Sequence, residues 1–141
     1  MQYLPLTTED EATLASDREF LPAVVDAHYS GHRLSGAPFD IPLMQRVLEG
    51  GLYSDSPIAE LVALGTVLGD LIANRLRFKW VRYSDDQGVD LALRFGETSI
   101  VIFPRSMLTK RIEDGEDPDL QNLFDGLVKE VERMLASGDY Q

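Results

Sequence analysis

The stretch PIAELVALGTVLGDLIANRL, residues 57–76, constrains the fold most, because it is apolar on nearly every face of a helix. Gly65 and Gly69 lie four residues apart on one of those faces. There, the missing side chains let another backbone approach, at a cost of about 1 kcal/mol each in helix propensity. The same spacing pairs helices in lipid, but Asp70 and Arg75 argue against a membrane span. We therefore predict a buried central helix that packs tightly on a sheet.

Three short segments after this helix have the pattern of strands. FKWVRYS (78–84) ends at the turn DDQG, VDLALRF (89–95) alternates apolar and polar residues, and SIVIFP (99–104) follows the turn GET. The short connections predict an antiparallel meander. Residues 100–103 are all apolar, which predicts a third strand that is covered on both faces and ends at Pro104.

The first third of the chain has the pattern of interrupted helices. Thr8 and Glu11 have capping-box spacing and predict the start of a short helix. Asp17 predicts the start of a second helix, in which Pro22 marks a kink or a late start. The stretch SGHRLSGAPFDIP then predicts a loop.

Three further helix boundaries can be read from the sequence. Pro42 predicts the start of a short helix that ends near Gly50, and Ser56 caps the central helix. Asp117 and Pro118 predict the start of a closing helix. Its apolar residues fall on a single stripe: Leu120, Leu123, Phe124, Leu127, Val128, Val131, Met134 and Leu135.

These elements together predict an α+β fold. Helices pack on one face of a three-stranded antiparallel meander, with a buried central helix and a C-terminal amphipathic helix. The length of 141 residues predicts a single domain. Within it, residues 1–55 form a helical N-terminal part and residues 56–141 form helix, meander and helix.

Composition and charge limit the classes of function. The chain has no cysteine, which excludes disulfides, thiolate metal sites and cysteine nucleophiles. Its beginning lacks the pattern of a secretory signal, so we expect a cytoplasmic protein. The net charge of −11 argues against nucleic-acid binding. The charge is uneven, because residues 61–112 carry eight bases and five acids whereas both ends are acidic.

The sequence contains no motif that predicts a catalytic site, a cofactor or a metal. His28 and His32 lie four residues apart, but no carboxylate stands in the relation of a zinc motif. Asp85 and Asp86 are adjacent in a predicted hairpin turn, where aspartate is favoured for backbone reasons. The acidic loop EDGEDPD lacks the spacing of a calcium loop. We interpret all of these as structural residues.

A cluster of donors follows the predicted third strand and admits two interpretations. In the first, it captures a small anion such as a carboxylate or phosphate, with Trp80 or Tyr83 as an apolar wall. In the second, which we favour, the basic groups pair with acids of the same chain. The ligand-binding candidates are Arg105, Ser106, Thr109, Lys110, Arg111 and Trp80.

The segments LGTVLGD, FKWVRYSDDQGVDLALRF and SIVIFPRSMLTKRIEDGE resemble a bacterial family known as domain of unknown function 3806. The resemblance covers about residues 61–116 and implies no reaction or cofactor. It places emphasis on Gly65, Gly69, Trp80, Asp85, Gly88, Pro104, Ser106, Lys110 and Arg111.

Three hypotheses on function remain. The leading one is a protein-binding or inhibitor-like module that docks on a basic partner protein. Its candidate residues are exposed acids: Glu9, Asp10, Asp17, Glu113, Asp114, Glu116 and Asp117. The alternative is a small-anion-binding protein, or an enzyme, that uses the basic cluster. A homo-oligomer held by an apolar patch of Tyr3, Leu4 and Leu6 is the third.

Overall fold

The computed structural model describes residues 1–50 and 57–138, which form five α-helices and a four-stranded sheet. The elements follow in the order β1 (Gln2–Leu4), α1 (Thr8–His28), the 3-10 turn η1 (Pro38–Asp40), α2 (Ile41–Glu49), α3 (Pro57–Leu76), β2 (Phe78–Asp85), β3 (Gly88–Phe95), β4 (Val101–Ile102), α4 (Pro104–Glu113) and α5 (Leu120–Ser137). This arrangement confirms the predicted α+β class.

The strands form an antiparallel sheet in the order β1-β2-β3-β4. The predicted meander is confirmed, and its first turn joins Asp85 to Gly88, which lie opposite each other. The N-terminus adds a strand that the sequence did not predict, with Tyr3 opposite Tyr83. It was missed because three residues are too few to establish an alternating pattern.

β4 differs from the expectation of a strand covered on both faces. It is a two-residue strand at the edge of the sheet, and Val101 and Ile102 are only half-buried. Phe103 packs edge-to-face on Tyr83, with the ring centroids 5.1 Å apart. The apolar run therefore places aromatic rings together instead of forming a fully covered strand.

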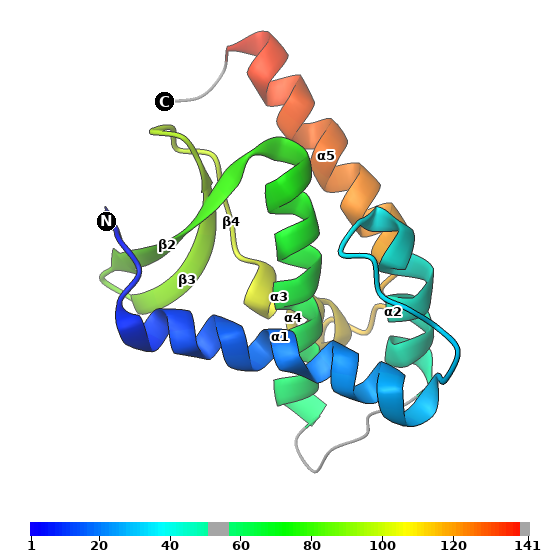
Figure 1. Cartoon of the computed structure of the whole chain (residues 1–141). Coiled ribbons are helices and arrows are strands. Elements are labelled where there is room, and N and C mark those ends of the chain that lie inside the picture. The colour runs from blue at the N-terminus through cyan, green and yellow to red at the C-terminus, as the bar shows by residue number, and fades with distance from the viewer. Residues whose placement is uncertain (51–56, 139–141) are drawn as a thin grey trace.

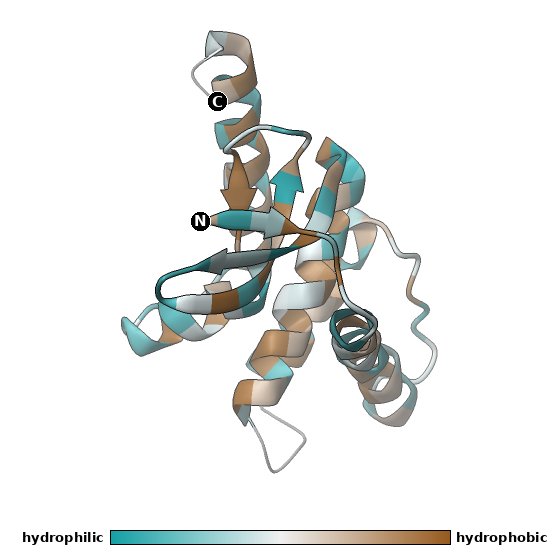
Figure 2. Cartoon of the chain, turned by 90° about the vertical axis from the view of Figure 1, so that its left-hand side faces the viewer, coloured by the Kyte–Doolittle hydropathy of each residue, from teal (hydrophilic) through white to brown (hydrophobic). Residues whose placement is uncertain are grey.

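The helices lie on one side of the sheet (Figure 1), and Figure 2 shows the sheet nearest the viewer with the helices behind or beside it. α3 lies at the centre of the helical layer, where Leu64, Leu68 and Ile72 are fully buried. By length and composition alone α3 could cross a membrane, but 56% of its apolar stretch is buried inside the protein. The predicted central core helix is confirmed.

α1 is one continuous helix and not the two short ones predicted. Its capping box uses Thr7 and Asp10, one residue before the predicted pair. Asp17 lies inside this helix, and its carboxylate accepts hydrogen bonds from Thr66 and Arg105 and does not cap a helix. Pro22 lies inside the helix, where Leu21 and Val24 are buried. Burial of this face maintains the helix past a residue that removes a backbone donor.

Two boundaries near the C-terminus also differ from the prediction. The segment after β4 is the helix α4, with Pro104 in its first turn, and the sequence analysis did not predict this helix. α5 begins at Leu120, because Asp119 and not Asp117 is the N-cap and accepts the N–H of Asn122 at 3.0 Å. The predicted cap Ser56 lies outside the described residues.

α2 and α5 otherwise match the sequence pattern. Pro42 lies in the first turn of α2, which ends at Glu49 before Gly50. The apolar stripe of α5 faces the core, where Leu120 is fully buried and Phe124 is 5% exposed. Both helices contribute to the hydrophobic core around α3.

Candidate functional site

One face of α3 lies directly against the first turn of α4. A Cβ atom on Gly65 would lie 2.2 Å from the carbonyl oxygen of Pro104. A Cβ atom on Gly69 would lie 2.7 Å from the Cβ of Pro104 and 3.1 Å from Trp80. Only glycine allows this approach, since real Cβ atoms do not come within 3.0 Å of backbone. The contact fixes α4 and Trp80 relative to α3.

The neighbouring face of α3 carries polar residues that meet α1. Thr66 is fully buried and donates its hydroxyl to Asp17 at 2.7 Å. Arg105, on α4, donates Nε to the same carboxylate oxygen at 2.9 Å. The Asp17 side chain is 13% exposed and that of Arg105 is 25% exposed. One aspartate of α1 therefore joins α3 and α4.

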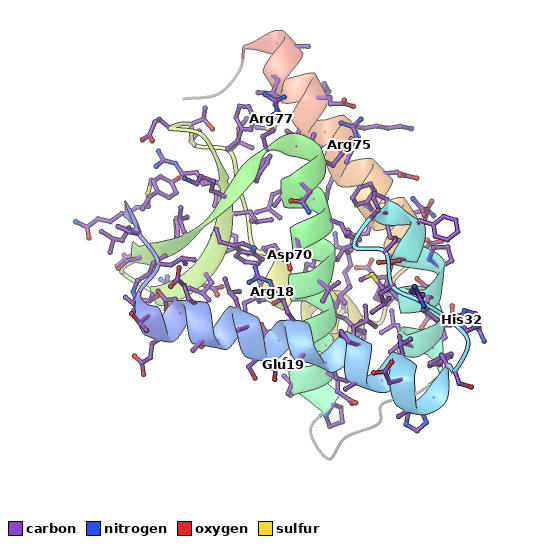
Figure 3. All side chains as sticks on the ribbon, in the orientation of Figure 1. Arg18, Glu19, His32, Asp70, Arg75 and Arg77 are labelled. Atoms are coloured by element: carbon purple, nitrogen blue, oxygen red, sulfur yellow. The ribbon has the colours of Figure 1, made fainter. Side chains whose placement is uncertain are left out.

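One turn further along α3, a second cluster joins α1, α3 and β2. Arg18 donates Nε and Nη2 to the two oxygens of Asp70, at 2.8 and 2.9 Å. Trp80 donates its indole N–H to Asp70 Oδ1 at 2.9 Å. Figure 3 shows Arg18 and Asp70 facing one another between α1 and α3. The hydrogen bonds to Asp70 raise the pKa of Arg18 above its ordinary value.

A third ion pair holds the beginning of α1 against the sheet. Arg82 of β2 donates to Asp10 at 2.6 Å, and the backbone N–H of Thr7 donates to the same side chain at 2.9 Å. Burial alone would raise the pKa of Asp10, but the hydrogen bonds from Thr7 and Arg82 lower it below its ordinary value. Asp10 is therefore a buried carboxylate that stays ionised at neutral pH.

A groove opens beside the Arg18, Asp70 and Trp80 cluster, between α1, α3 and the start of β2. Its volume is about 660 Å³, and apolar side chains make up most of its wall. We call it the α1–α3 groove. It is lined by Leu6, Arg18, Leu21, Pro22, Leu34, Gly36, Asp40, Val67, Asp70, Leu71, Ala73, Asn74, Phe78, Lys79 and Trp80.

Two exposed polar side chains line this groove, those of Asn74 and Lys79. Neither side chain forms a hydrogen bond or ion pair with any residue that the structure describes. A second hollow, of about 450 Å³, shares Leu6, Lys79 and Trp80 with the groove. Lys79 therefore lies where two hollows meet.

Comparison with protein families supports the resemblance seen in the sequence. The model of the family described as domain of unknown function 3806 matches residues 40–124, more than half of the chain. The chain belongs to this family.

A solved structure shows the same fold. It is a crystal structure from Bacteroides thetaiotaomicron VPI-5482 at 1.50 Å resolution, with a TM-score of 0.78 and 15% sequence identity. The match covers 90% of this chain and 47% of the other, so the chain spans about half the length of that protein. Curated proteins give no match.

The positions that carry the resemblance to the 3806 family meet at the contact between α3 and α4. Gly65 and Gly69 lie against Pro104, and Trp80 lies beside Gly69. These residues set the distance between helices and also place the indole in the wall of the α1–α3 groove. For this part of the family pattern, packing and the candidate site depend on the same residues.

The turn between β2 and β3 accounts for two further positions of the family pattern. Asp85 accepts the backbone N–H of Gln87 at 2.8 Å, and Gly88 has φ of +132°, which favours glycine. The interpretation of the adjacent aspartates as turn residues is confirmed. Among the described residues, no group of three or more histidine, aspartate or glutamate side chains is arranged to hold a metal ion.

The predicted ligand-binding residues do not converge on one site. Arg105 pairs with Asp17, and Arg111 donates to the carbonyl of Met107 at 3.1 Å. Lys110 is exposed and lines a separate hollow beside Tyr83. The remaining candidates lie elsewhere: Thr109 donates to the carbonyl of Ser106 on α4, and Trp80 lines the α1–α3 groove.

The predicted partner-binding acids fall into two groups. Asp10 and Asp17 are internal, since each holds an arginine of another element. Glu9 is exposed in the first turn of α1. The other four are exposed around the loop between α4 and α5: Glu113, Asp114, Glu116 and Asp117. The residues proposed for oligomerisation lie in the sheet and the groove: Tyr3 contacts Tyr83, Leu4 is in β1, and Leu6 lines the groove.

The sequence analysis did not identify Arg18, Asn74 or Lys79 as site residues. One signal was present, since Asp70 is the one charged residue in the largely apolar stretch 61–73 of α3. A carboxylate at such a position requires a partner. The sequence does not say which element supplies it.

Proposed function

We propose that the chain is a cytoplasmic binding protein, not an enzyme, and that it holds a small, largely apolar molecule in the α1–α3 groove. The observation that carries this proposal is the groove itself. A volume of about 660 Å³ lies within the usual range for small-molecule sites, which are mostly apolar with a few polar groups. Leu21, Leu71 and Phe78 supply apolar wall, and Lys79 and Asn74 supply the polar groups.

The wall of the groove is held in place by bonds between three elements. Asp70 accepts hydrogen bonds from Arg18 and Trp80, which belong to α1 and β2. Gly69 allows Trp80 to lie close against α3. A site already held in its binding shape loses less conformational entropy when a ligand enters. A groove held in this way favours molecules that match its shape.

The same bonds argue against catalysis in the groove. A general base needs a lone pair directed at the substrate, but Asp70 accepts three hydrogen bonds from the protein. Arg18 stays protonated, because Asp70 raises its pKa. Asp40 accepts hydrogen bonds from the backbone N–H groups of Ser35 and Gly36. These charged groups thus support the shape of the groove.

Trp80 is the single tryptophan of the chain, so its fluorescence reports directly on the groove. We expect decanol, a neutral apolar probe, to change the Trp80 emission with a saturable dependence on concentration. Ala73→Phe, which fills the groove, should weaken binding by at least about tenfold, a loss of roughly 1.4 kcal/mol. Ala12→Phe places the same side chain on the exposed surface of α1 and should bind as the wild type does. Equal binding by the Ala73 variant would refute the proposal.

A second candidate function is docking of a basic protein at the loop between α4 and α5. The observation that favours it is a run of exposed acids in a chain with net charge −11. A partner captured by the wild type at low salt should be lost when the loop acids are neutralised together. Retention of that partner by the neutralised variant would exclude this surface. The variant replaces Glu113 and Glu116 with Gln and Asp114 and Asp117 with Asn.

A further inference from the structure

We infer that the molecule held in the α1–α3 groove is an organic anion: an apolar body that ends in a carboxylate, with the carboxylate at Lys79. The inference rests on the proposed function and names its ligand class. The apolar wall accommodates the body of such a molecule. Lys79 and Asn74 offer an ammonium and an amide, the groups that hydrogen-bond a carboxylate.

Of the charged side chains that line the groove, only that of Lys79 has neither a hydrogen bond nor a counterion among the residues that the structure describes. Arg18 and Asp70 neutralise each other through two hydrogen bonds. Asp40 is 6% exposed, and its two oxygens accept hydrogen bonds from Ser35 and Gly36. Its lone pairs are therefore occupied, and a bound cation would have to displace the loop. Lys79 is exposed and has no partner in the part of the chain that the structure describes.

Lys79 and Asp40 each line a further hollow that adjoins the groove. Asp40 lines a hollow with His32 and Phe39, beside the loop that follows α1. Lys79 instead lines the hollow beside Pro5, which Glu11, Arg94 and Glu97 also line. These two hollows share no lining residue. A molecule with one anionic end is therefore expected to place that end at Lys79, on β2, and not at the carboxylate of Asp40.

The net charge of the protein opposes the binding of an anion. At −11 the protein as a whole repels anions and attracts cations. A ligand that responded only to the overall field would therefore bind better with a positive end group. Preference for an anion has to come from a local group in the groove, and Lys79 is that group.

The test uses three probes with the same chain and different ends: decanoate, decanol and decylamine. Each is titrated against the wild type while the Trp80 emission is followed. We expect decanoate to bind about tenfold more tightly than decanol, because a hydrogen bond to a charged group contributes more than a neutral one. Decylamine should bind most weakly. Lys79→Met should abolish the preference for decanoate and leave decanol binding unchanged, while Lys129→Met, on an exposed face of α5, should retain the preference.

The outcomes separate this inference from the proposed function. Equal binding of decanoate and decanol by the wild type, or tighter binding of decylamine, would refute the anionic ligand and leave the groove as a binding site. A preference for decanoate that survives in Lys79→Met would also refute it. If none of the three probes changes the Trp80 emission, the proposed function fails and this inference fails with it. Lys79 is exposed, so thermal unfolding of its variant should match the wild type.

Discussion

Two adjacent faces of α3 are held by opposite kinds of contact. Gly65 and Gly69 face α4, where the helix backbone meets Pro104 without any intervening side chain. Thr66 and Asp70, each one residue further on, face α1 and form hydrogen bonds to charged side chains. The contact on the first face requires residues without a side chain. The contact on the second face requires partners of the correct charge. The two faces therefore respond differently to the same experiments.

The comparison also explains which contacts the sequence could predict. The glycine face is a local pattern, because four-residue spacing alone indicates a close approach. The partners of the polar face are distant in sequence: Thr66 and Asp17 are 49 residues apart, and Arg105 and Asp17 are 88 residues apart. No local pattern in a single sequence contains that pairing.

The largest effect is expected on the glycine face. Gly65→Ala should lower the free energy of unfolding by about 3 kcal/mol, since the new Cβ meets backbone that cannot move alone. Gly69→Ala meets the side chains of Pro104 and Trp80 and should cost less. Urea denaturation followed by Trp80 fluorescence measures both.

Gly126→Ala is the control for these variants. Gly126 lies within α5 with no atom of the described residues within 4 Å of its Cβ position, so alanine should stabilise the protein by about 1 kcal/mol. If Gly65→Ala changed stability in the same direction, the contact between α3 and α4 would not be as close as described.

A smaller effect is expected on the polar face. Asp17→Ala leaves the buried Thr66 hydroxyl and the partly buried Arg105 without their shared acceptor, which should cost about 2 kcal/mol. Asp117→Ala removes an exposed acid of the second group and should change stability by less than about 0.5 kcal/mol. Thermal unfolding of the two variants in parallel tests the comparison. Similar losses in both would mean that the loop acid also has a structural role.

The smallest effect is one of pH, and it concerns the ion pair at the start of α1. The folded pKa of Asp10 is lowered, so this group contributes stability above its unfolded pKa of about 3.9. That stability is lost as pH falls through the folded pKa, because the unfolded chain binds the proton first. Asp10→Asn keeps a hydrogen-bond acceptor but has no such titration. The stability difference between wild type and Asp10→Asn should therefore shrink below pH of about 4. A constant difference across this range would show that the charge of Asp10 does not contribute.

The elements that sequence analysis predicted well are those with a repeating local pattern. α3, α5 and the hairpin of β2 and β3 follow from apolar spacing and a two-residue turn. β1 was missed because it is short, and α1 was divided because Pro22 and Asp17 resemble interruptions when their packing is unknown. Trp80 is the one predicted ligand-binding candidate that lines the groove, and the residues around it come from several elements.

The walls of the α1–α3 groove come from two parts of the chain, one inside and one outside the range that the family model matches. The family model covers residues 40–124, which include Asp70, Lys79 and Trp80. Leu6, Arg18 and the rest of the opposite wall lie before residue 40, outside the matched part. The part of the chain that the family model matches thus supplies one side of the groove, and the N-terminal segment supplies the other. Exchange of that segment alone would therefore change the shape of the groove while leaving the glycine contact between α3 and α4 intact.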